Sequence, residues 1–350
     1  MTSKRRDIVR EDCRRALAGG TEMLAPLRNS ALFVTGGTGF VGTWLTEMIA
    51  CLNDEHGFNV HVTLMARQCG RFVETAEHLA ARKDVTVVLK DVRSVLDLPP
   101  ETQWIIHAAA TPDRRVHASD PVGAVDVIVN GTRAMLVAAV QLSQLRKFLN
   151  ISSGLIYGTQ PWDMPAISES FCGSLDCANV SSGYPEAKRF AETLCAAYQS
   201  EHRLIISTVR PFAFIGPYQP LGLPWAGTDF IRDAMLGGPI RVHGDGQTIR
   251  SHMYPSDMAY WLLNILVKGR SGQAYNVGSA RGVTLAEFAA RIADCVPGRP
   301  RIEFGVLGER RPPASKRVPD VSLCASALSL GLSTDLDMAI KRTISWNQTT

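Results

Sequence analysis

The feature that most constrains the fold is a glycine-rich segment near the N-terminus. Residues 31–45 read ALFVTGGTGFVGTWL, an apolar strand-like run, then glycines at 36, 39 and 42, then a helix-like pattern. The backbone N–H groups and the positive end of a helix that starts after such a turn face outward and attract an anion. The segment therefore predicts a phosphate-binding turn, and its spacing after a strand makes an ordinary tight turn the weaker interpretation.

Each glycine of this turn has a separate predicted role. Gly36 can take the backbone angles needed to leave the strand, Gly39 lets the main chain approach a pyrophosphate, and Gly42 permits close helix packing. The residues that we expect to contact a dinucleotide here are Gly36, Thr38, Gly39, Phe40, Val41 and Gly42.

Composition excludes several function classes. A chain of 350 residues with 45% hydrophobic and 20% charged residues is typical of a soluble globular protein with room for two lobes. The net charge of +4 comes without a dense basic stripe or an aromatic RNA-binding signature, so we expect no nucleic-acid partner. The eight cysteines form no C-x-x-C pair and no His/Cys metal spacing, so we expect reduced thiols and no metal site.

The N-terminus carries no targeting pattern. Lys4, Arg5 and Arg6 are followed by further charged residues rather than by an apolar signal core. No apolar run reaches membrane-spanning length. We therefore expect a cytoplasmic protein without a membrane partner.

Alternating strand and helix patterns from residue 31 onward predict an α/β fold, a doubly wound parallel Rossmann sheet covered by helices. The six predicted strands are Leu32–Thr35, Val60–Met65, Thr86–Leu89, Trp104–His107, Lys147–Ile151 and Leu204–Val209. The predicted helices between them include Trp44–Leu52, Val125–Leu142 and Pro185–Ser200.

Changes in composition and pattern along the chain divide it into three parts. Residues 1–28 predict a charged helical extension laid against the main domain, with Ile8, Val9 and Leu17 as contacts. Residues 29–210 predict the dinucleotide-binding domain, which also carries the catalytic residues. Beyond that, residues 211–350 are rich in glycine and proline and predict mainly a smaller C-terminal α/β lobe for substrate.

The ends of the predicted strands indicate which dinucleotide binds. An acidic residue after the second strand would bind the ribose hydroxyls of NAD, whereas a basic residue accepts the 2′-phosphate of NADP. This chain has Arg67 there, which favours NADP(H) over NAD(H) unless the arginine is merely exposed. Further along, Asp91 and Val92 predict an adenine contact, and the small residues 108–110 leave room for the dinucleotide. These last predicted contacts are Ala108, Ala109 and Ala110.

A serine, a tyrosine and a lysine carry the predicted chemistry. Ser153 follows the fifth strand, while Tyr184 and Lys188 lie one helical turn apart behind Pro185, a residue suited to a first helical turn. An unperturbed phenol titrates near pH 10, and a neighbouring ammonium group should lower that pKa. Tyr184 could then exchange a proton with a carbinol whose oxygen Ser153 binds, while Lys188 also holds the nicotinamide ribose. The alternative is that the Tyr-x-x-x-Lys spacing arises by chance and that the two residues form an exposed pair on the surface of a helix.

Together these motifs resemble the extended short-chain dehydrogenases/reductases and, within them, the nucleotide-sugar epimerase/dehydratase group. The resemblance runs from residue 31 to about residue 346 and includes GDGQTIRSHMYPSD at 244–257 and YNVG at 275–278. It implies Ser153, Tyr184 and Lys188 as the catalytic triad and a nucleotide-diphospho-sugar as the substrate. It also implies a homodimer formed through the helices near Val125–Leu142 and Pro185–Ser200, although apolar helix faces could equally be core.

The resemblance also implies two arginines for the substrate diphosphate. Arg250 matches the arginine of the G-D-G-x-x-x-R segment, and a guanidinium fork suits a diphosphate. Arg311 is similar to a second arginine that many members use. Its neighbourhood, with Arg310, Lys316 and Arg317, could equally be a solvated basic loop.

Departures from the family pattern narrow the predicted reaction. The 4,6-dehydratases follow the catalytic hydroxyl with an Asp-Glu pair and the decarboxylases carry a glutamate, whereas this chain has Gly154 and Leu155. Neither residue transfers a proton, and Gly154 cannot replace the cysteine of fucose-synthase-type epimerases. Ala213 stands where many members bind the substrate phosphate through asparagine.

With those reactions disfavoured, the remaining expectation is simple oxidation or reduction at one carbinol, C4 of the sugar. We expect an NADP(H)-dependent 4-ketoreductase, with a 4-epimerase using retained NAD as the alternative. A non-catalytic dinucleotide-binding protein is a remote alternative, since such proteins commonly lose the tyrosine or the lysine. An oxidoreductase for steroids or aryl alcohols would share the triad but would not need the segment around Arg250.

Overall fold

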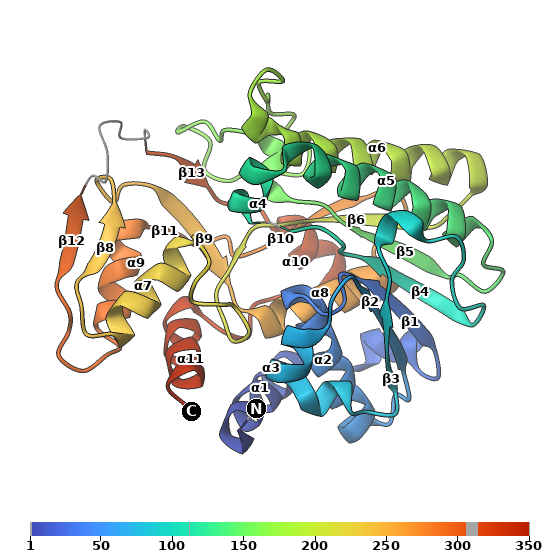
Figure 1. Cartoon of the computed structure of the whole chain (residues 1–350), viewed down its shortest axis with the longest axis horizontal. Helices are drawn as coiled ribbons and strands as arrows, with labels where there is room; N and C mark the ends of the chain where they lie inside the picture. Colours follow the sequence, from blue (N-terminus) through green and yellow to red (C-terminus); the bar gives the residue numbers. More distant parts are fainter. Residues whose placement is uncertain (1, 112, 306–313, 350) are drawn as a thin grey trace.

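A sheet of seven parallel strands forms the centre of the computed structural model, which describes residues 2–111, 113–305 and 314–349. The strand order is β10-β6-β5-β4-β1-β2-β3 (Figure 1). The strands are β1 (Ala31–Thr35), β2 (His61–Ala66), β3 (Val85–Leu89), β4 (Thr102–His107), β5 (Lys147–Ile151), β6 (Ile206–Pro211) and β10 (Ala274–Val277). The order reverses between β1 and β4, the place where doubly wound sheets bind ligands beyond the carboxyl ends of their strands.

The predicted strands are confirmed, but the predicted number is wrong by one. The sequence placed Lys147–Ile151 without error and the other five strands within two residues at each end. The seventh strand, β10, pairs with β6 from well beyond the predicted boundary at residue 210. Four residues are too short to show a period, and only pairing with a distant strand defines this element.

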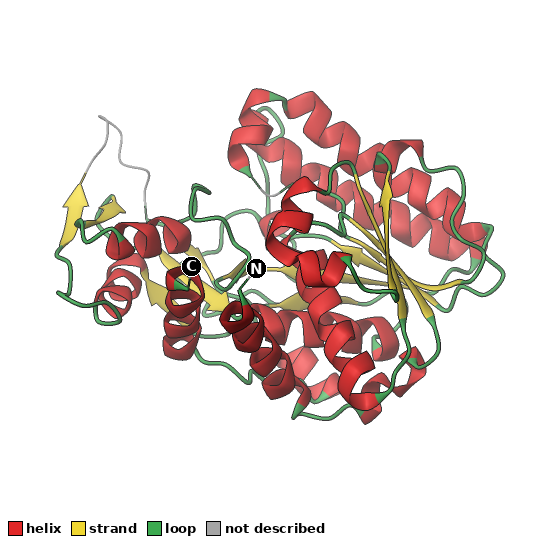
Figure 2. Ribbon diagram, turned by 60° about the horizontal axis from the view of Figure 1, so that its bottom comes forward, coloured by secondary structure: helices red, strands yellow, loops and turns green. Residues whose placement is uncertain are grey.

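Helices cover both faces of the sheet (Figure 2). On one face lie α2 (Phe40–His56), α8 (Pro255–Lys268) and the N-terminal α1 (Ser3–Leu17), whose apolar residues join one large core. On the other face lie α5 (Pro121–Val140) and α6 (Gly183–His202), which pack against each other (Figure 1). The short α3 (Gly70–Ala80) packs against α2 and β3.

Among the described residues, only α5 is long and apolar enough to cross a membrane by length and composition. It packs against α6 and against the short helix η2 (Val92–Ser94), and core helices of soluble proteins have the same length and composition.

The rest of the chain builds a smaller lobe with two further sheets. Strand β9 (Ile249–Met253) pairs with β7 (Ala213–Phe214), β11 (Gly282–Thr284) and β13 (Lys316–Arg317), and β8 (Ile240–His243) pairs with β12 (Ile302–Gly305). The helices of this part are α7 (Ala226–Met235), α9 (Leu285–Ala293), α10 (Ser322–Leu328) and α11 (Leu336–Gln348). Helix α8 packs on the large sheet and β10 is one of its strands, although both follow residue 210 in the chain.

The N-terminal extension lies against the body of the protein, as the sequence predicts. Helix α1 and the 3-10 helix η1 (Glu22–Leu27) place Val9 and Leu17 in the core, with Ile8 packed beside it. The fully buried Asp12 of α1 accepts a hydrogen bond of 2.6 Å from the Tyr254 hydroxyl, and it pairs with Arg342 of α11. The extension therefore joins the two lobes near both chain ends (Figure 1).

Candidate active site

The glycine turn has the geometry that its sequence predicts. Gly36 has a φ of +64°, and a Cβ there would lie 2.8 Å from the carbonyl oxygen of Ala108. Gly39 is the N-cap of α2, and Gly42 packs so closely on Gly37 that a Cβ would collide with its backbone. The turn and the end of β4 therefore approach each other at the switch point of the sheet.

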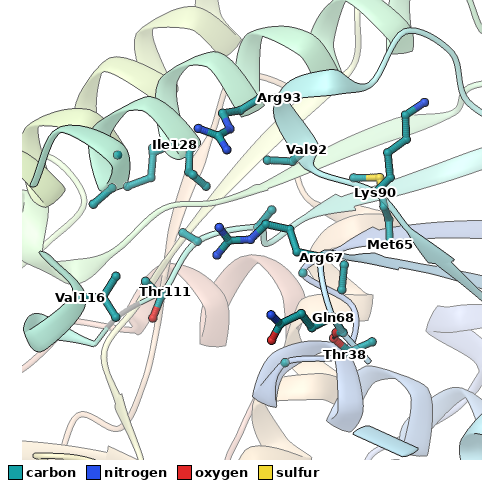
Figure 3. Close-up of a pocket in the computed structure, with 18 of the residues that line it drawn as sticks. Thr38, Met65, Arg67, Gln68, Lys90, Val92, Arg93, Thr111, Val116 and Ile128 are labelled. Atoms are coloured by element: carbon teal, nitrogen blue, oxygen red, sulfur yellow. The ribbon is translucent and has the colours of Figure 1, made fainter. Parts of the chain in front are cut away.

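A cavity of about 530 Å³ opens at this point (Figure 3). The predicted cofactor residues that line it are Gly36, Thr38, Gly39, Arg67, Val92, Ala109 and Ala110. Those that do not line it are Phe40, Val41, Gly42, Asp91, Ala108, Tyr184 and Lys188. The cavity thus combines the turn after β1 with the ends of β2, β3 and β4, and the ligand roles of these residues stay predictions.

Three basic side chains line this cavity. Arg67 extends into it, with Arg93 above and Lys90 toward one end (Figure 3). Arg67 donates no hydrogen bond to any residue that the structure describes, whereas Arg93 is held by Asp91 at 2.8 Å and by Asp126 at 2.6 Å. Arg67 is therefore available to an anion, and Lys90 is a second candidate that our sequence analysis missed.

Asp91, the predicted adenine contact, already has a hydrogen-bond partner in Arg93. Its carboxylate accepts hydrogen bonds from the backbone N–H and the guanidinium of Arg93, and this side-chain bond lowers its pKa to about 2. Arg67 adds a smaller electrostatic contribution in the same direction. The carboxylate is therefore ionised, and it can still accept a further hydrogen bond.

A buried histidine holds the loop after β4 against the glycine turn. The Thr35 hydroxyl accepts hydrogen bonds from the backbone N–H groups of Ala108 and Ala109, at 3.0 and 3.1 Å. The same hydroxyl lies 2.8 Å from Nδ1 of His107, whose Nε2 is 3.1 Å from the Thr132 hydroxyl. Burial lowers the pKa of His107 to about 3, so a neutral ring links the two hydroxyl groups.

None of the three predicted catalytic residues lines this cavity. Ser153 follows β5, its hydroxyl accepts a hydrogen bond from the Leu155 N–H, and its side chain is hydrogen-bonded to Tyr184. Tyr184 lies in the first turn of α6, as predicted, and Lys188 lies one turn further. All three side chains are buried.

The predicted effect of Lys188 on the phenol is wrong for this structure. Burial raises the pKa of Tyr184 to about 12, opposed only by the hydrogen bond with Ser153. The Lys188 Nζ donates to the carbonyl oxygen of Ile151 at 2.7 Å, and burial lowers its own pKa to about 8. Sequence spacing placed both residues on one helix but could not show which partner the ammonium group chooses.

Gly154 and Leu155 occupy the two positions where the sequence comparison expects an acid or base in other members of the family. A Cβ on Gly154 would lie 2.9 Å from the ring of Phe212, so this position has no room for an acidic side chain. Leu155 packs instead with the cluster around Tyr184. The two positions that follow Ser153 therefore carry no proton-transferring side chain.

The C-terminal lobe contributes a pair of arginines on neighbouring strands. Arg250 of β9 is the register partner of Arg317 of β13, and its guanidinium donates to the Ser315 hydroxyl at 2.8 Å. The pKa of Arg317 falls to about 10, first because of burial and then because Arg250 and Arg114 are near, and its buried Nε has no hydrogen-bond partner among the described residues. Such a cluster of like charges is suited to an anionic ligand.

In the described part of the chain, the arginine beside Arg250 is Arg317. The predicted residue Arg311 lies outside the described residues. Our sequence analysis assigned Arg317 only to a basic loop, because a two-residue strand leaves no periodic signal. The pairing of β13 with β9 is the information that was missing.

The fold and this site define a Rossmann-type enzyme of the extended short-chain dehydrogenase/reductase class. Residues 32–278 match the model of the NAD dependent epimerase/dehydratase family. The chain belongs to this family, which confirms the resemblance predicted from its motifs.

Curated relatives include UDP-glucuronic acid decarboxylases. The chain is 25% identical to UDP-glucuronic acid decarboxylase 1 of Danio rerio over 315 residues, covering 90% of this chain and 72% of the relative. It is 28% identical to UDP-glucuronic acid decarboxylase 4 of Arabidopsis thaliana over 289 residues, covering 83% and 62%.

Solved structures share the fold at lower identity. The UDP-N-acetylglucosamine 4-epimerase of Methanobrevibacter ruminantium matches with a TM-score of 0.77 and 20% identity, over 91% of this chain and 98% of that one. The UDP-glucuronic acid 4-epimerase of Bacillus cereus, solved with UDP-glucuronic acid and NAD, matches with a TM-score of 0.76 and 20% identity, over 90% and 98%. Both of these proteins are 4-epimerases of UDP-sugars, and at this identity the match shows a shared fold alone.

Proposed function

We propose that this protein is an NADP(H)-dependent nucleotide-diphospho-sugar oxidoreductase that reduces a 4-keto, 6-deoxy sugar at C4. The observation that carries this proposal is the set of side chains next to Ser153 and Tyr184. Ser153 and Tyr184 can bind and protonate one oxygen, while Gly154 and Leu155 offer no acid or base for elimination, decarboxylation or epimerisation next to the ketone.

The residues around the cavity fit a dinucleotide with a 2′-phosphate. The turn from Gly36 to Gly39 and the N-terminus of α2 suit a pyrophosphate, because their N–H groups face an approaching anion. Arg67 and Lys90 lie where the 2′-phosphate of NADP would add charge to the ribose. When bound, the nicotinamide supplies the hydride of the reduction.

The chain's own groups then complete the reduction. Tyr184 keeps its proton at neutral pH because burial raises its pKa to about 12, so it can protonate the alkoxide that forms at C4. Ser153 binds the same oxygen and orients it toward the phenol. Because Lys188 donates to the carbonyl of Ile151, the last residue of β5, we assign to it the positioning of the strand end and of the nicotinamide ribose.

Arg250 and Arg317 complete the proposal on the substrate side. Both guanidinium groups lie on adjacent strands of the smaller lobe, and a nucleotide diphosphate would supply the negative charge that this pair lacks. A substrate without phosphate, such as a steroid, would leave these charges close together and uncompensated.

The first experiment is to release and identify any co-purifying dinucleotide and then follow NADPH absorbance. UDP- and dTDP-linked 4-keto-6-deoxyhexoses are added in turn, with UDP-glucose and UDP-glucuronic acid as comparison substrates. We expect stoichiometric NADPH consumption with a 4-keto sugar. Retained NAD with interconversion of two C4 epimers would establish a 4-epimerase instead, and release of CO₂ from UDP-glucuronic acid would establish a decarboxylase.

We also propose a homodimer formed through α5 and α6. Both helices expose large apolar side chains, with Val137 44% and Phe190 49% exposed, and such residues are frequent in protein interfaces. In light scattering after size exclusion we expect two chains per particle. Phe190→Asp should shift the particle to one chain. A mass of one chain per particle for both the unaltered protein and the variant would contradict this assembly.

A further inference from the structure

His117 makes an aromatic contact with the proposed proton donor. Its ring stacks on the ring of Tyr184 with a centroid distance of 4.4 Å and an interplanar angle of 17°. His117 belongs to the short helix α4 (Arg114–Ser119), which directly precedes α5 and packs against it (Figure 1). Neither the glycine turn nor the Tyr-x-x-x-Lys motif includes this histidine.

The other side of the histidine ring is fixed to the cavity wall. Its Nε2 lies 2.7 Å from the carbonyl oxygen of Thr111 and, since a carbonyl only accepts, that nitrogen carries the proton. His117 and Thr111 both line the cavity that we assign to the dinucleotide. The imidazole thus connects this wall to the phenol through one hydrogen bond and one stacked face.

Few other groups hold the phenol in place. Its partners are the Ser153 side chain and the small apolar cluster that includes Ala187 and Ile128, while Lys188 is committed to the backbone of Ile151. A stacked pair of rings contributes about 0.5–1.5 kcal/mol beyond its buried area, enough to favour one orientation of a tyrosine.

Charged groups lie near His117 on α4 and at both of its ends. The Asp113 side chain caps this helix, and Arg115 forms an ion pair with the Asp113 carboxylate at 2.7 Å. Asp120, which caps α5, lines the same cavity. The 3-10 helix η4 (Val180–Ser182) also packs on α4 and brings no titratable side chain.

We propose that His117 is a positioning residue, whose ring holds the Tyr184 hydroxyl toward Ser153 and ties it to the wall of the cofactor cavity. This inference rests on the proposed function for the role of Tyr184, but the contact itself can be tested without turnover. The stacked face, rather than a charge on the imidazole, carries the effect.

The test compares His117→Ala with His117→Phe, which keeps a flat ring. Ser119→Ala on the exposed side of the same helix is the matched control. Turnover is measured with NADPH and a dTDP-linked 4-keto-6-deoxyhexose, and NADPH affinity by its fluorescence. The ionisation of Tyr184 in the protein without added cofactor is measured as the ultraviolet difference titration against Tyr184→Phe.

We expect His117→Ala to lower kcat by about 10-fold with an unchanged KM for the sugar, since small misplacements of a reacting group cost one to two orders of magnitude. Loss of the ring admits water, so the pKa of Tyr184 should fall from about 12 toward its ordinary value. His117→Phe should restore both values to near those of the unaltered protein.

The inference is overturned if His117→Ala matches Ser119→Ala in both kcat and tyrosine titration. It is also overturned if His117→Phe is as impaired as His117→Ala, because stacking then has no part in the effect. Retained turnover in Tyr184→Phe would refute the proposed function instead, and the titration would still decide whether His117 shields the phenol.

Discussion

Arg67 is the residue on which the proposed preference for NADP(H) depends. Its guanidinium extends into the cavity without a hydrogen bond to any described residue, so a bound 2′-phosphate would gain a charged partner (Figure 3). A hydrogen bond to a charged group contributes about 1.5–3 kcal/mol, or roughly 10- to 100-fold in affinity.

We therefore expect Arg67→Ala to weaken NADPH about 10- to 100-fold and NADH by less than about 3-fold. Lys90→Ala should also weaken NADPH more than NADH, but by a smaller factor, because an ammonium group makes no bidentate contact. Fluorescence titration with both cofactors measures these constants. An equal loss for NADH and NADPH would show that Arg67 does not read the 2′-phosphate.

Tyr184 is the residue whose removal tests the chemistry itself. Phenylalanine keeps the ring that stacks on His117 but loses the hydroxyl that bonds to Ser153. Because general acid catalysis contributes about 10²- to 10⁴-fold, Tyr184→Phe should lower kcat by such a factor while NADPH affinity stays nearly constant. Tyr198→Phe on the same helix is the control, and equal activity of the two variants would remove Tyr184 from the mechanism.

At the scale of elements, the pairing of β9 with β13 creates the substrate-side cluster. It places Arg250 next to Arg317, while β11 on the other edge of β9 carries no arginine. Burial lowers the pKa of Arg317, and the charge of Arg250 lowers it further, so an anion between the two guanidinium groups would relieve their repulsion.

Each single alanine substitution, at Arg250 or at Arg317, should raise the KM of the nucleotide sugar about 10-fold or more, since a charged contact is lost. The double substitution should cost less than the product of the two single effects, because neighbouring residues share one ligand. Initial rates over a range of sugar concentrations measure this coupling. Arg301→Ala, at an exposed arginine just before β12, is the control. Full independence of the two effects would mean that Arg250 and Arg317 contact different groups.

At the scale of the whole molecule, α1 and α11 meet around the buried carboxyl group of Asp12. Burial raises its pKa to about 6, outweighing the Tyr254 hydrogen bond and the charge of Arg342. The unfolded chain, with a value near 3.8, binds fewer protons than the folded protein between these two values. This group therefore stabilises the fold at low pH, and its contribution is lost as pH rises through about 6.

The comparison protein is Asp12→Asn, which does not titrate. From pH 4 to pH 7, the free energy of unfolding of the unaltered protein should decline by about 2 kcal/mol relative to this variant. Urea unfolding at a series of pH values measures the difference. A difference that grows with pH would mean that Arg342 and Arg15 hold the carboxyl group ionised instead.

The sequence by itself determined the parts of this protein that depend on short-range physics. The glycine spacing predicted the turn at 36–42, alternating apolar runs predicted six strands, and the Tyr184–Lys188 spacing predicted one face of one helix. Each of these signals lies within a few residues, so backbone sterics and local hydrogen bonding suffice to read them.

Tertiary structure alone decided what those elements meet. It brought β10 beside β6, Arg317 beside Arg250, and His117 onto Tyr184, and it directed Lys188 to a backbone carbonyl instead of lowering the phenol pKa. These contacts join residues far apart in the chain, and burial sets the pKa values at the site. No local pattern encodes either effect, because both depend on how the whole chain excludes water.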